Sequence, residues 1–244
     1  MKSVNNISFD FIGSTVLVIG GSKGIGKSIS NKFSASGARV FCASRTSHSS
    51  DSINFIKCDI SKEEDIENLF REIDEKVPRL DFVINVAGTN LCEPIENISS
   101  AEWDRVVNTN LKSFYLICRE SVKRMKPNKF GRIVNVSSIA GRNKSIVSGV
   151  HYTSSKAGII GLTRQLAHEV SKHGINVNVT CPSQTLTEML EQSMTRKQIS
   201  DLEEKIPIKR IATVEEQALP VLFLCSDAAS YITGAAIDIN GGQL

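Results

Sequence analysis

The chain has 244 residues, and its 29 Lys and Arg nearly balance its 26 Asp and Glu, leaving a formal net charge of +3. A chain with such nearly equal numbers of positive and negative charges lacks the basic surface on which nucleic-acid binding depends. No apolar run is long enough to span a membrane. None of the six cysteines stands in a Cys-x-x-Cys pair or at zinc spacing with a histidine, so we expect reduced, buried thiols and no metal site. No signal peptide is visible at the N-terminus, which predicts a cytoplasmic protein.

The first predicted strand, residues 15–19, runs directly into a glycine-rich turn and then a helix that continues to Phe33. Glycines let the backbone approach a ligand closely, and a helix N-terminus presents free N–H groups to an anion, so this order is typical of a phosphate site. The spacing Gly-x-x-x-Gly-x-Gly differs from the common fingerprint, and a plain strand-to-helix turn is the alternative. The cofactor-binding candidates in this turn are Gly20, Ser22, Lys23, Gly24, Ile25 and Gly26.

The end of the second predicted strand, residues 39–43, indicates which dinucleotide binds. NAD sites usually carry an acid about 20 residues past the glycines, where it holds the ribose 2′-hydroxyl. This chain has Ser44 and Arg45 there and no acid before Asp51. A guanidinium suits the 2′-phosphate of NADP, and Lys23 adds a second positive charge, so we expect NADP(H), with NAD(H) as the second choice. A solvated loop arginine is the competing interpretation.

Apolar strands alternate with helices along the rest of the chain, which predicts a parallel sheet covered on both faces. Ser61 and Glu64 have the spacing of a capping box at the start of a helix. We expect one domain over residues 1–244, an α/β Rossmann fold with a doubly wound, seven-stranded parallel sheet. The further strands are predicted at 53–57, 80–86, 130–136, 175–181 and 235–239, and the further helices at 61–76, 100–125, 152–172 and 215–225.

Ser137 and Ser138 follow the predicted strand 130–136, and doubly wound sheets bind their ligands at strand ends. After a loop over 139–150, Tyr152 and Lys156 share one face of a helix. The pKa of a tyrosine is ordinarily about 10, and a neighbouring ammonium should lower it toward that of a usable acid and base. With Ser138 on the substrate oxygen, this set fits hydride exchange between a nicotinamide and a ketone or secondary alcohol.

Three further features carry expectations of their own. Asn108 and Asn110 interrupt an otherwise regular helical pattern, which favours a polar task, with a local kink as the alternative. His151 is expected at the end of a loop, facing solvent or substrate. The polar segment 185–210 follows a strand end and suits a mobile flap over the substrate.

Together these motifs make the chain resemble a compact short-chain dehydrogenase/reductase over nearly its whole length. Within that family its general pattern is most similar to that of the 3-oxoacyl-[acyl-carrier-protein] reductases. Departures from the family pattern are Ile19 before the first glycine, Val86, Ser183, and one extra residue between Ser138 and Tyr152. The resemblance rests on Gly20, Gly24, Gly26, Asp59, Asn85, Val86, Ala87, Gly88, Asn110, Ser138, Tyr152, Lys156, Pro182, Ile232, Thr233, Gly234, Gly241 and Gly242.

The resemblance implies a role for each matching residue. Tyr152 would be the acid and base, with Ser138 on the substrate oxygen. Lys156 would hold the nicotinamide ribose and tune Tyr152, and Asn110 would fix a water of a proton relay. The implied cofactor contacts are Asp59 with Ile60 at the adenine, Asn85, Ala87 and Gly88 along the cofactor, and Pro182, Thr185 and Thr187 at the carboxamide.

The resemblance also implies partners. They are a small carbonyl or alcohol substrate and a homotetramer or homodimer built on helices 101–126 and 152–172. An acyl carrier protein is implied more weakly, through Lys129, with His173 where a second basic residue is expected. Two alternatives remain: a sugar, polyol or secondary-metabolite dehydrogenase of the same family, and a nucleotide-binding regulator without catalysis.

Overall fold

The structure, a computed structural model, describes residues 8–46, 51–145, 147–188, 190 and 195–244. Within these residues a seven-stranded parallel sheet has the order β3-β2-β1-β4-β5-β6-β7. The chain winds outward from β1 in one direction and from β4 in the other, which confirms the predicted doubly wound fold. The strands are β1 Thr15–Ile19, β2 Arg39–Ser44, β3 Ile53–Lys57, β4 Phe82–Asn85, β5 Gly131–Val136, β6 Ile175–Pro182 and β7 Ala236–Ile239.

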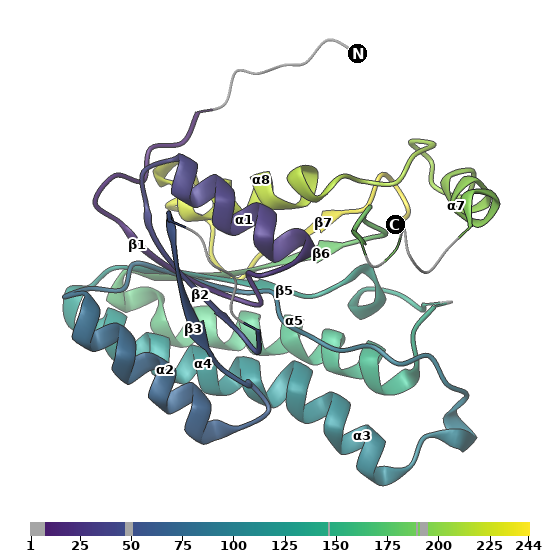
Figure 1. Cartoon of the computed structure of the whole chain (residues 1–244), viewed down its shortest axis with the longest axis horizontal. Helices are drawn as coiled ribbons and strands as arrows, with labels where there is room; N and C mark the ends of the chain where they lie inside the picture. The colour runs from purple at the N-terminus through teal and green to yellow at the C-terminus, as the bar shows by residue number, and fades with distance from the viewer. Residues whose placement is uncertain (1–7, 47–50, 146, 189, 191–194) are drawn as a thin grey trace.

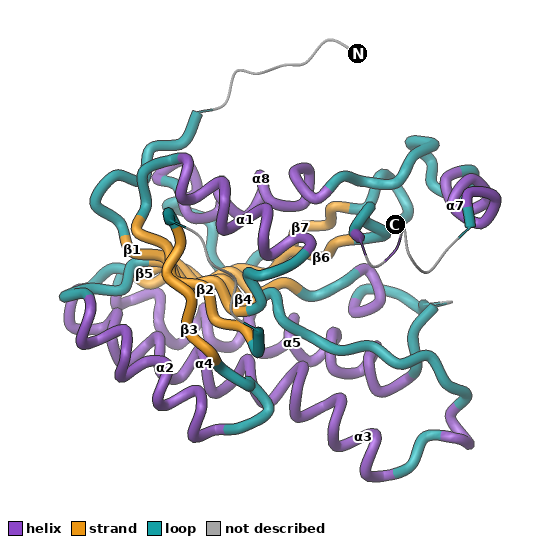
Figure 2. Tube along the Cα trace, viewed as in Figure 1, coloured by secondary structure: helices purple, strands orange, loops and turns teal. Residues whose placement is uncertain are grey.

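Helices cover both faces of the sheet, which Figure 2 shows as the orange layer between purple helices. Successive residues of a strand point to opposite faces, so Val16 packs with Phe33 of α1 while Leu17 packs with Phe70 of α2. Two apolar cores, one on each face, therefore hold the sheet. Figure 1 shows α1 (Gly24–Ala35) and α8 (Val214–Cys225) above it, and α2 (Glu63–Lys76), α4 (Ser113–Met125) and α5 (Val150–Val170) below it.

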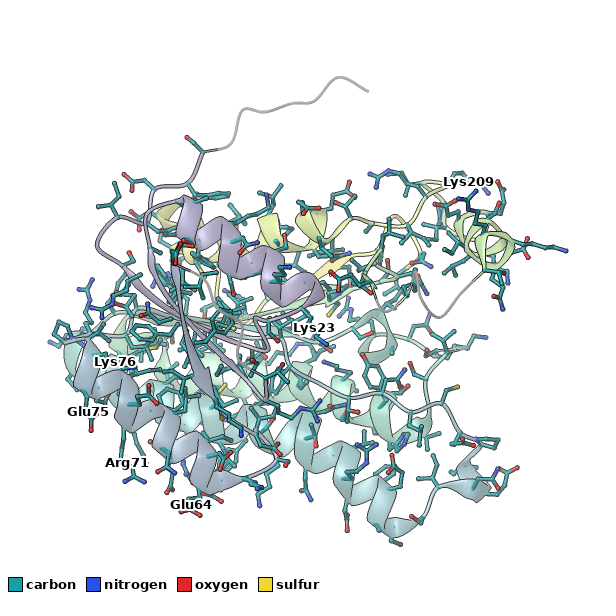
Figure 3. All side chains as sticks on the ribbon, in the orientation of Figure 1. Lys23, Glu64, Arg71, Glu75, Lys76 and Lys209 are labelled. Atoms are coloured by element: carbon teal, nitrogen blue, oxygen red, sulfur yellow. The ribbon has the colours of Figure 1, made fainter. Side chains whose placement is uncertain are left out.

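The remaining elements surround the carboxyl ends of the strands or connect the layers. Helix α7 (Arg196–Glu203) stands apart from the main body, with Lys209 beside it in Figure 3. It forms part of the segment predicted as a flap; residues 189 and 191–194 of that segment, and residue 146 of the 139–150 loop, lie outside the described residues. Short 3₁₀ turns occur at Ile95–Asn97, Lys126–Asn128, Ile139–Gly141, Ser171–His173 and Asp227–Ala229. Over the described ranges, no helix has the length and apolar character needed to cross a bilayer.

The start of α2 differs from the prediction. The helix begins at Glu63, its N-cap is Lys62 without a capping side chain, and Ser61 Oγ instead donates to Asp59 Oδ1 over 2.8 Å. The predicted Ser61–Glu64 capping box is therefore wrong, because Ser61 lies one residue too early and is already engaged. Acidic residues in the first turn stabilise the helix start instead, because their negative charge interacts favourably with the helix dipole. One of them, Glu64, points away from the sheet in Figure 3.

The predicted helix 100–125 is interrupted, as its asparagines indicated. Helix α3 (Ser100–Val107) leads into a π-helical turn, Asn108–Lys112, before α4 continues. A π-helical turn accommodates one extra residue in the helical hydrogen-bond ladder, and such turns are frequent at functional sites. The buried side chain of Asn110 is turned here toward the segment that follows β4.

Candidate active site

The carboxyl ends of three neighbouring strands bring the predicted residues to one edge of the sheet. Ile19 of β1 pairs with Asn85 of β4, and Asn85 pairs with Asn135 of β5. The strand order reverses between β1 and β4, and a doubly wound sheet binds its ligand at that reversal. The glycine turn, residues 87–88 and Ser138 directly follow these three strand ends.

The glycine turn has the shape of a phosphate cradle. Gly20 has a φ of +82°, and a Cβ added to it would lie 2.8 Å from backbone atoms of Ala87. A Cβ on Gly26 would lie 2.2 Å from the carbonyl oxygen of Gly20, so the turn closes only with glycine at both places. The backbone therefore carries no side chain at Gly20 and Gly26, where a ligand would approach.

The first turn of α1 is also open to an anion. Its N-cap residue, Lys23, makes no capping hydrogen bond through its side chain, and no acidic residue stands in the first turn. Lys23 lies at this end of the helix in Figure 3. Free N–H groups and a nearby ammonium fit the pyrophosphate of a dinucleotide. The turn, with Ser22, Gly24 and Ile25 in it, thus fits the predicted group.

The ends of β2 and β3 bring Arg45 and Asp59 near each other. Hydrogen bonds from Ser61 hold the pKa of the Asp59 carboxyl below its usual value, and the Arg45 charge adds to this effect. Arg45 is exposed, whereas Ser44 and Ile60 are half-buried beside it. An exposed guanidinium therefore lies at the place where the sequence predicts a 2′-phosphate.

Ser138 and Tyr152 are brought together across the loop that separates them. The Ser138 hydroxyl lies close enough to the phenol to lower the pKa of Tyr152. Ser138 Oγ also accepts from the backbone N–H of Ala140 over 3.1 Å, which fixes the hydroxyl at the end of β5. The side chain of Ser137 turns away to the carbonyl oxygen of Lys156, over 2.7 Å. Of the serine pair, Ser138 alone faces the tyrosine.

Lys156 lies beneath Tyr152 and is nearly inaccessible to solvent. Its side chain is 4% exposed, Nζ donates to the carbonyl oxygen of Val136 over 2.9 Å, and Nζ lies 5.7 Å from the centroid of the Tyr152 ring. Burial lowers the pKa of Lys156 to about 8. The sequence therefore placed the pair correctly on one helix face.

The expected lowering of the Tyr152 pKa is not found. Burial raises the pKa of the phenol, and the neighbouring Ser138 side chain opposes this only in part. The prediction considered the ammonium alone, but desolvation also disfavours the phenolate. The phenol is thus held in its protonated form, as a proton donor.

Asn110 is committed to the chain segment that follows β4. Its Oδ1 accepts from the N–H of Thr89 and its Nδ2 donates to the carbonyl oxygen of Thr89, both over 2.8 Å. Nδ2 also donates to Ser155 Oγ over 3.2 Å. A Cβ added to Gly88 would lie 3.2 Å from Asn110 Oδ1 and 3.5 Å from Lys156 Nζ, so glycine lets these groups meet.

The predicted carboxamide segment lies over the glycine turn. Pro182 ends β6, Thr185 forms a parallel bridge with Ala212, and Thr185 Oγ1 donates to the carbonyl oxygen of Ser183 over 3.0 Å. A Cβ added to Gly24 would lie 3.3 Å from the methyl group of Thr187. Thr187 therefore lies against the first residue of α1, next to the glycine turn.

Sequence reasoning missed a buried polar chain behind the site. Asn85 Nδ2 donates to Asn135 Oδ1 over 2.7 Å, and Asn135 Nδ2 donates to Thr163 Oγ1 over 2.9 Å. These three side chains are fully buried and join β4, β5 and α5. An asparagine inside an apolar strand was the available signal.

His151 is placed differently from its prediction. Helix α5 begins at Val150, two residues earlier than expected, so His151 is its second residue and is fully buried. It faces neither solvent nor an open substrate cleft. Its Nδ1 accepts from the backbone N–H of Tyr152 over 3.0 Å.

The chain is similar to known proteins over nearly its whole length. A family model described as Enoyl-(Acyl carrier protein) reductase matches residues 20–243. The 3-oxoacyl-[acyl-carrier-protein] reductase FabG of Rickettsia felis is 34% identical over 247 residues, covering 96% of this chain and 98% of its own length.

Two solved structures are similar over the whole fold. Levodione reductase superposes with a TM-score of 0.90 at 30% identity, covering 96% of this chain and 98% of that one. The RhlG/NADP active-site complex of Pseudomonas aeruginosa also gives a TM-score of 0.90, at 28% identity, with 96% and 98% covered.

The chain therefore belongs to the short-chain dehydrogenase/reductase family. It is an NAD(P)-dependent oxidoreductase that acts on CH–OH donors.

Proposed function

We propose that this chain transfers hydride between NADP(H) and a ketone or secondary alcohol, with Tyr152 as the acid and base. The observation that carries this proposal is the placement of Ser138 beside Tyr152, with the buried Nζ of Lys156 5.7 Å from the centroid of the tyrosine ring. The bound nicotinamide supplies or accepts the hydride. In the reductive direction, Ser138 orients the carbonyl oxygen and Tyr152, protonated at neutral pH, donates its proton to that oxygen.

Lys156 and Asn110 assist Ser138 and Tyr152 in two different ways. Lys156 places positive charge near the phenol, so that charge developing on Tyr152 during proton donation is stabilised. Asn110 holds the backbone of Thr89 through two hydrogen bonds, and so fixes the neighbouring Gly88 close to Nζ of Lys156. Both polar atoms of the Asn110 side chain have protein partners, which favours a positioning role for it over direct capture of a relay water.

The preference for NADP is proposed from charge at the adenosine end. Arg45 is exposed there, and Lys23 begins the first turn of α1. A relative described as an NADP complex, at 28% identity, is consistent with this choice. The Asp59 carboxylate accepts two hydrogen bonds from Ser61 and lies near Arg45. These contacts reduce the repulsion that its negative charge would exert on a bound phosphate.

The substrate class that we propose is a 3-oxoacyl thioester, because FabG of Rickettsia felis is named a 3-oxoacyl-[acyl-carrier-protein] reductase. The carrier-protein part of this idea has less support. Lys129 and His173 lie in turns that touch, since a Cβ on Gly174 would lie 2.1 Å from the Lys129 carbonyl oxygen. Both turns precede β5 and β6, at the opposite edge of the sheet from Ser138. A carrier bound there would be remote from the site of the same subunit.

The test is oxidation of NADPH by the purified chain, followed as loss of absorbance, with 3-oxoacyl thioesters and a panel of other ketones. Tyr152→Phe should lower kcat by about 100- to 10,000-fold with little change in the Kd for NADPH, because only the transferable proton is removed. Turnover by Tyr152→Phe near that of the unchanged chain would contradict the proposal. NADPH binding without turnover on any carbonyl would favour a regulator.

A further inference from the structure

We propose that His151 is a positioning residue for the reaction: its Nδ1 caps the first turn of α5 and so fixes the backbone that carries Tyr152. The inference rests on the proposed role of Tyr152. It adds a function to a histidine that lies next to the tyrosine in sequence but has no path to a substrate, because its side chain is fully buried.

The first observation is that α5 has no conventional cap. Its N-cap residue is Gly149, which has no side chain to accept a hydrogen bond. Helices α3, α7 and α8 begin with Ser99, Thr195 and Thr213, and each hydroxyl accepts from the backbone N–H three residues on. The N–H at that position stabilises a helix start only when something accepts from it.

In α5 the N–H at this position belongs to Tyr152, and His151 accepts from it. The distance from the Tyr152 nitrogen to His151 Nδ1 is 3.0 Å. The imidazole thus replaces a cap serine from inside the helix. The helix start that is capped in this way is the one that carries Tyr152 and Lys156.

The second observation is that Gly149 is needed for space and not for its conformation. Its φ of −73° is available to any residue. A Cβ there would lie 2.6 Å from His151 Cε1 and 2.8 Å from His151 Nδ1. The N–H of Gly149 donates to the carbonyl oxygen of Leu91 over 3.0 Å, which ties the segment after β4 to the same turn. Gly149 and His151 are therefore a matched pair.

The third observation concerns the other ring nitrogen. Because Nδ1 accepts a hydrogen bond, the neutral imidazole carries its proton on Nε2. Nε2 is buried without a hydrogen-bond partner among the described residues and faces Glu102 Oε1 of α3 at 3.9 Å. Arg105 holds that carboxylate with two bonds of 2.7 and 2.6 Å and keeps its pKa below the usual value. A fixed negative charge opposite Nε2–H favours the tautomer that the cap requires.

These contacts make a short path from α3 to the phenol. Glu102 orients the imidazole, the imidazole holds the N–H of Tyr152, and the Tyr152 backbone sets the direction of its side chain. Ser155 Oγ donates to the carbonyl oxygen of Tyr152 over 2.7 Å, so both polar groups of that peptide backbone are held. A displacement of about 1 Å at a reacting group can lower a rate about 100-fold. Loss of the cap should therefore affect kcat more than cofactor binding.

Three substitutions separate this role from simple packing. The Oδ1 of His151→Asn reaches the place of Nδ1, the amide of His151→Gln reaches the place of Nε2, and His151→Leu fills the volume without an acceptor. We expect His151→Asn to keep kcat within about 3-fold, and the other two to lower it roughly 10- to 100-fold. The Kd for NADPH should change less than about 2-fold in all three, by the same reasoning.

The measurements are kcat and KM from NADPH oxidation, the Kd from NADPH fluorescence, and a thermal melt to confirm folding. If His151→Leu does not fold, the comparison of His151→Asn with His151→Gln decides, because both are polar and close in size. His151→Gln equal to or faster than His151→Asn, or His151→Leu as fast as the unchanged chain, would overturn the proposal.

A readout that needs no turnover separates this inference from the proposed function. In protein labelled with ¹⁵N-histidine, the His151 ring should show an unprotonated Nδ1 and a protonated Nε2 at neutral pH. Glu102→Gln should weaken that preference. The expected tautomer in a protein without turnover would refute the proposed function and leave the cap intact. The opposite tautomer would refute the cap whatever the activity.

Discussion

At the scale of single residues, the site holds a cation in surroundings that disfavour it. The Lys156 ammonium donates to one backbone carbonyl and lies 5.6 Å from the centroid of the Phe114 ring and 5.7 Å from that of Tyr152. No ion pair joins it to a carboxylate of the described residues. The role proposed for Lys156 therefore places a residue that costs folding stability at the site, as is common at active sites.

Replacement of this lysine should stabilise the protein while abolishing its activity. The Lys156 pKa of about 8 in the folded chain lies below its usual 10.5, so the unfolded chain binds more protons between these pH values and stability rises with pH there. Below about pH 8 the cost of the buried charge is fully present. We expect Lys156→Met to raise the free energy of unfolding by about 1–3 kcal/mol at pH 7, with the gain shrinking toward pH 10.

Urea denaturation of the cofactor-free protein at several pH values measures this effect. Lys156→Arg is the control, because a guanidinium stays charged throughout this range and should show no such gain. A Lys156→Met protein less stable than the unchanged chain at pH 7 would contradict the expectation.

The choice of cofactor should depend on one exposed charge. Arg45→Asp should lower the ratio of kcat/KM for NADPH to that for NADH at least 10-fold, since a carboxylate repels a 2′-phosphate and accepts from a 2′-hydroxyl. Arg39→Asp is a matched control, because Arg39 is an exposed arginine at the other end of the same strand. An equal effect of both substitutions would show that only the total charge matters.

At the scale of secondary-structure elements, buried amides align the catalytic helix with the sheet. The chain Asn85–Asn135–Thr163 runs from β4 through β5 to α5 and has no access to water. Its bonds are directional, so they fix the rotation of α5 more closely than apolar packing does. Ser138 on β5 and Tyr152 on α5 depend on that relation.

Loss of the middle member should cost stability and activity together. Asn135→Ala leaves the Asn85 amide and the Thr163 hydroxyl without their partner, so we expect a loss of about 1–3 kcal/mol in the free energy of unfolding. Thr163→Ser keeps the hydroxyl and serves as the control, with a smaller loss. Denaturation in urea, together with kcat, checks both, and an Asn135→Ala protein of unchanged stability would contradict the expectation.

Much of this organisation could be predicted from the sequence, because it depends on pattern. Apolar runs predicted the seven strands to within two residues, and the glycines predicted the tight turn between β1 and α1. The position of Ser138 followed from the rule that parallel strands bind ligands at their carboxyl ends, and the shared helix face of Tyr152 and Lys156 followed from their four-residue spacing.

The remaining features depend on burial, which spacing does not reveal. The Tyr152 pKa was misjudged because the charge of Lys156 is visible in sequence and desolvation is not. His151 was taken for a loop residue because the N-cap residue of its helix is Gly149, which has no side chain to signal a helix start. Ser61 matched a capping motif, yet its hydroxyl had a nearer partner in Asp59.

At the scale of the whole molecule, the outer surfaces of α3, α4 and α5 expose large apolar side chains. Trp103 is 38% exposed, Tyr115 48% and Val150 40%. We therefore expect a homodimer or homotetramer through these helices by light scattering. Joint replacement of Trp103 and Tyr115 by glutamate should lower the assembled mass, whereas Ile12→Glu, at an exposed turn before β1, should not. The mass of a single chain for the unchanged protein would refute the expectation.

The π-helical turn at Asn108–Lys112 has a consequence for how such a chain can vary. One surplus residue rotates everything before it by about 100° relative to everything after it, compared with a continuous α-helix. Deleting a single residue here would restore a regular helix at no cost in propensity. It would also swing Asn110 away from Thr89, or else turn the whole of α3, with Glu102, away from His151. Insertions and deletions should therefore be tolerated in the surface loops and selected against at this turn, where length itself carries the geometry of the site.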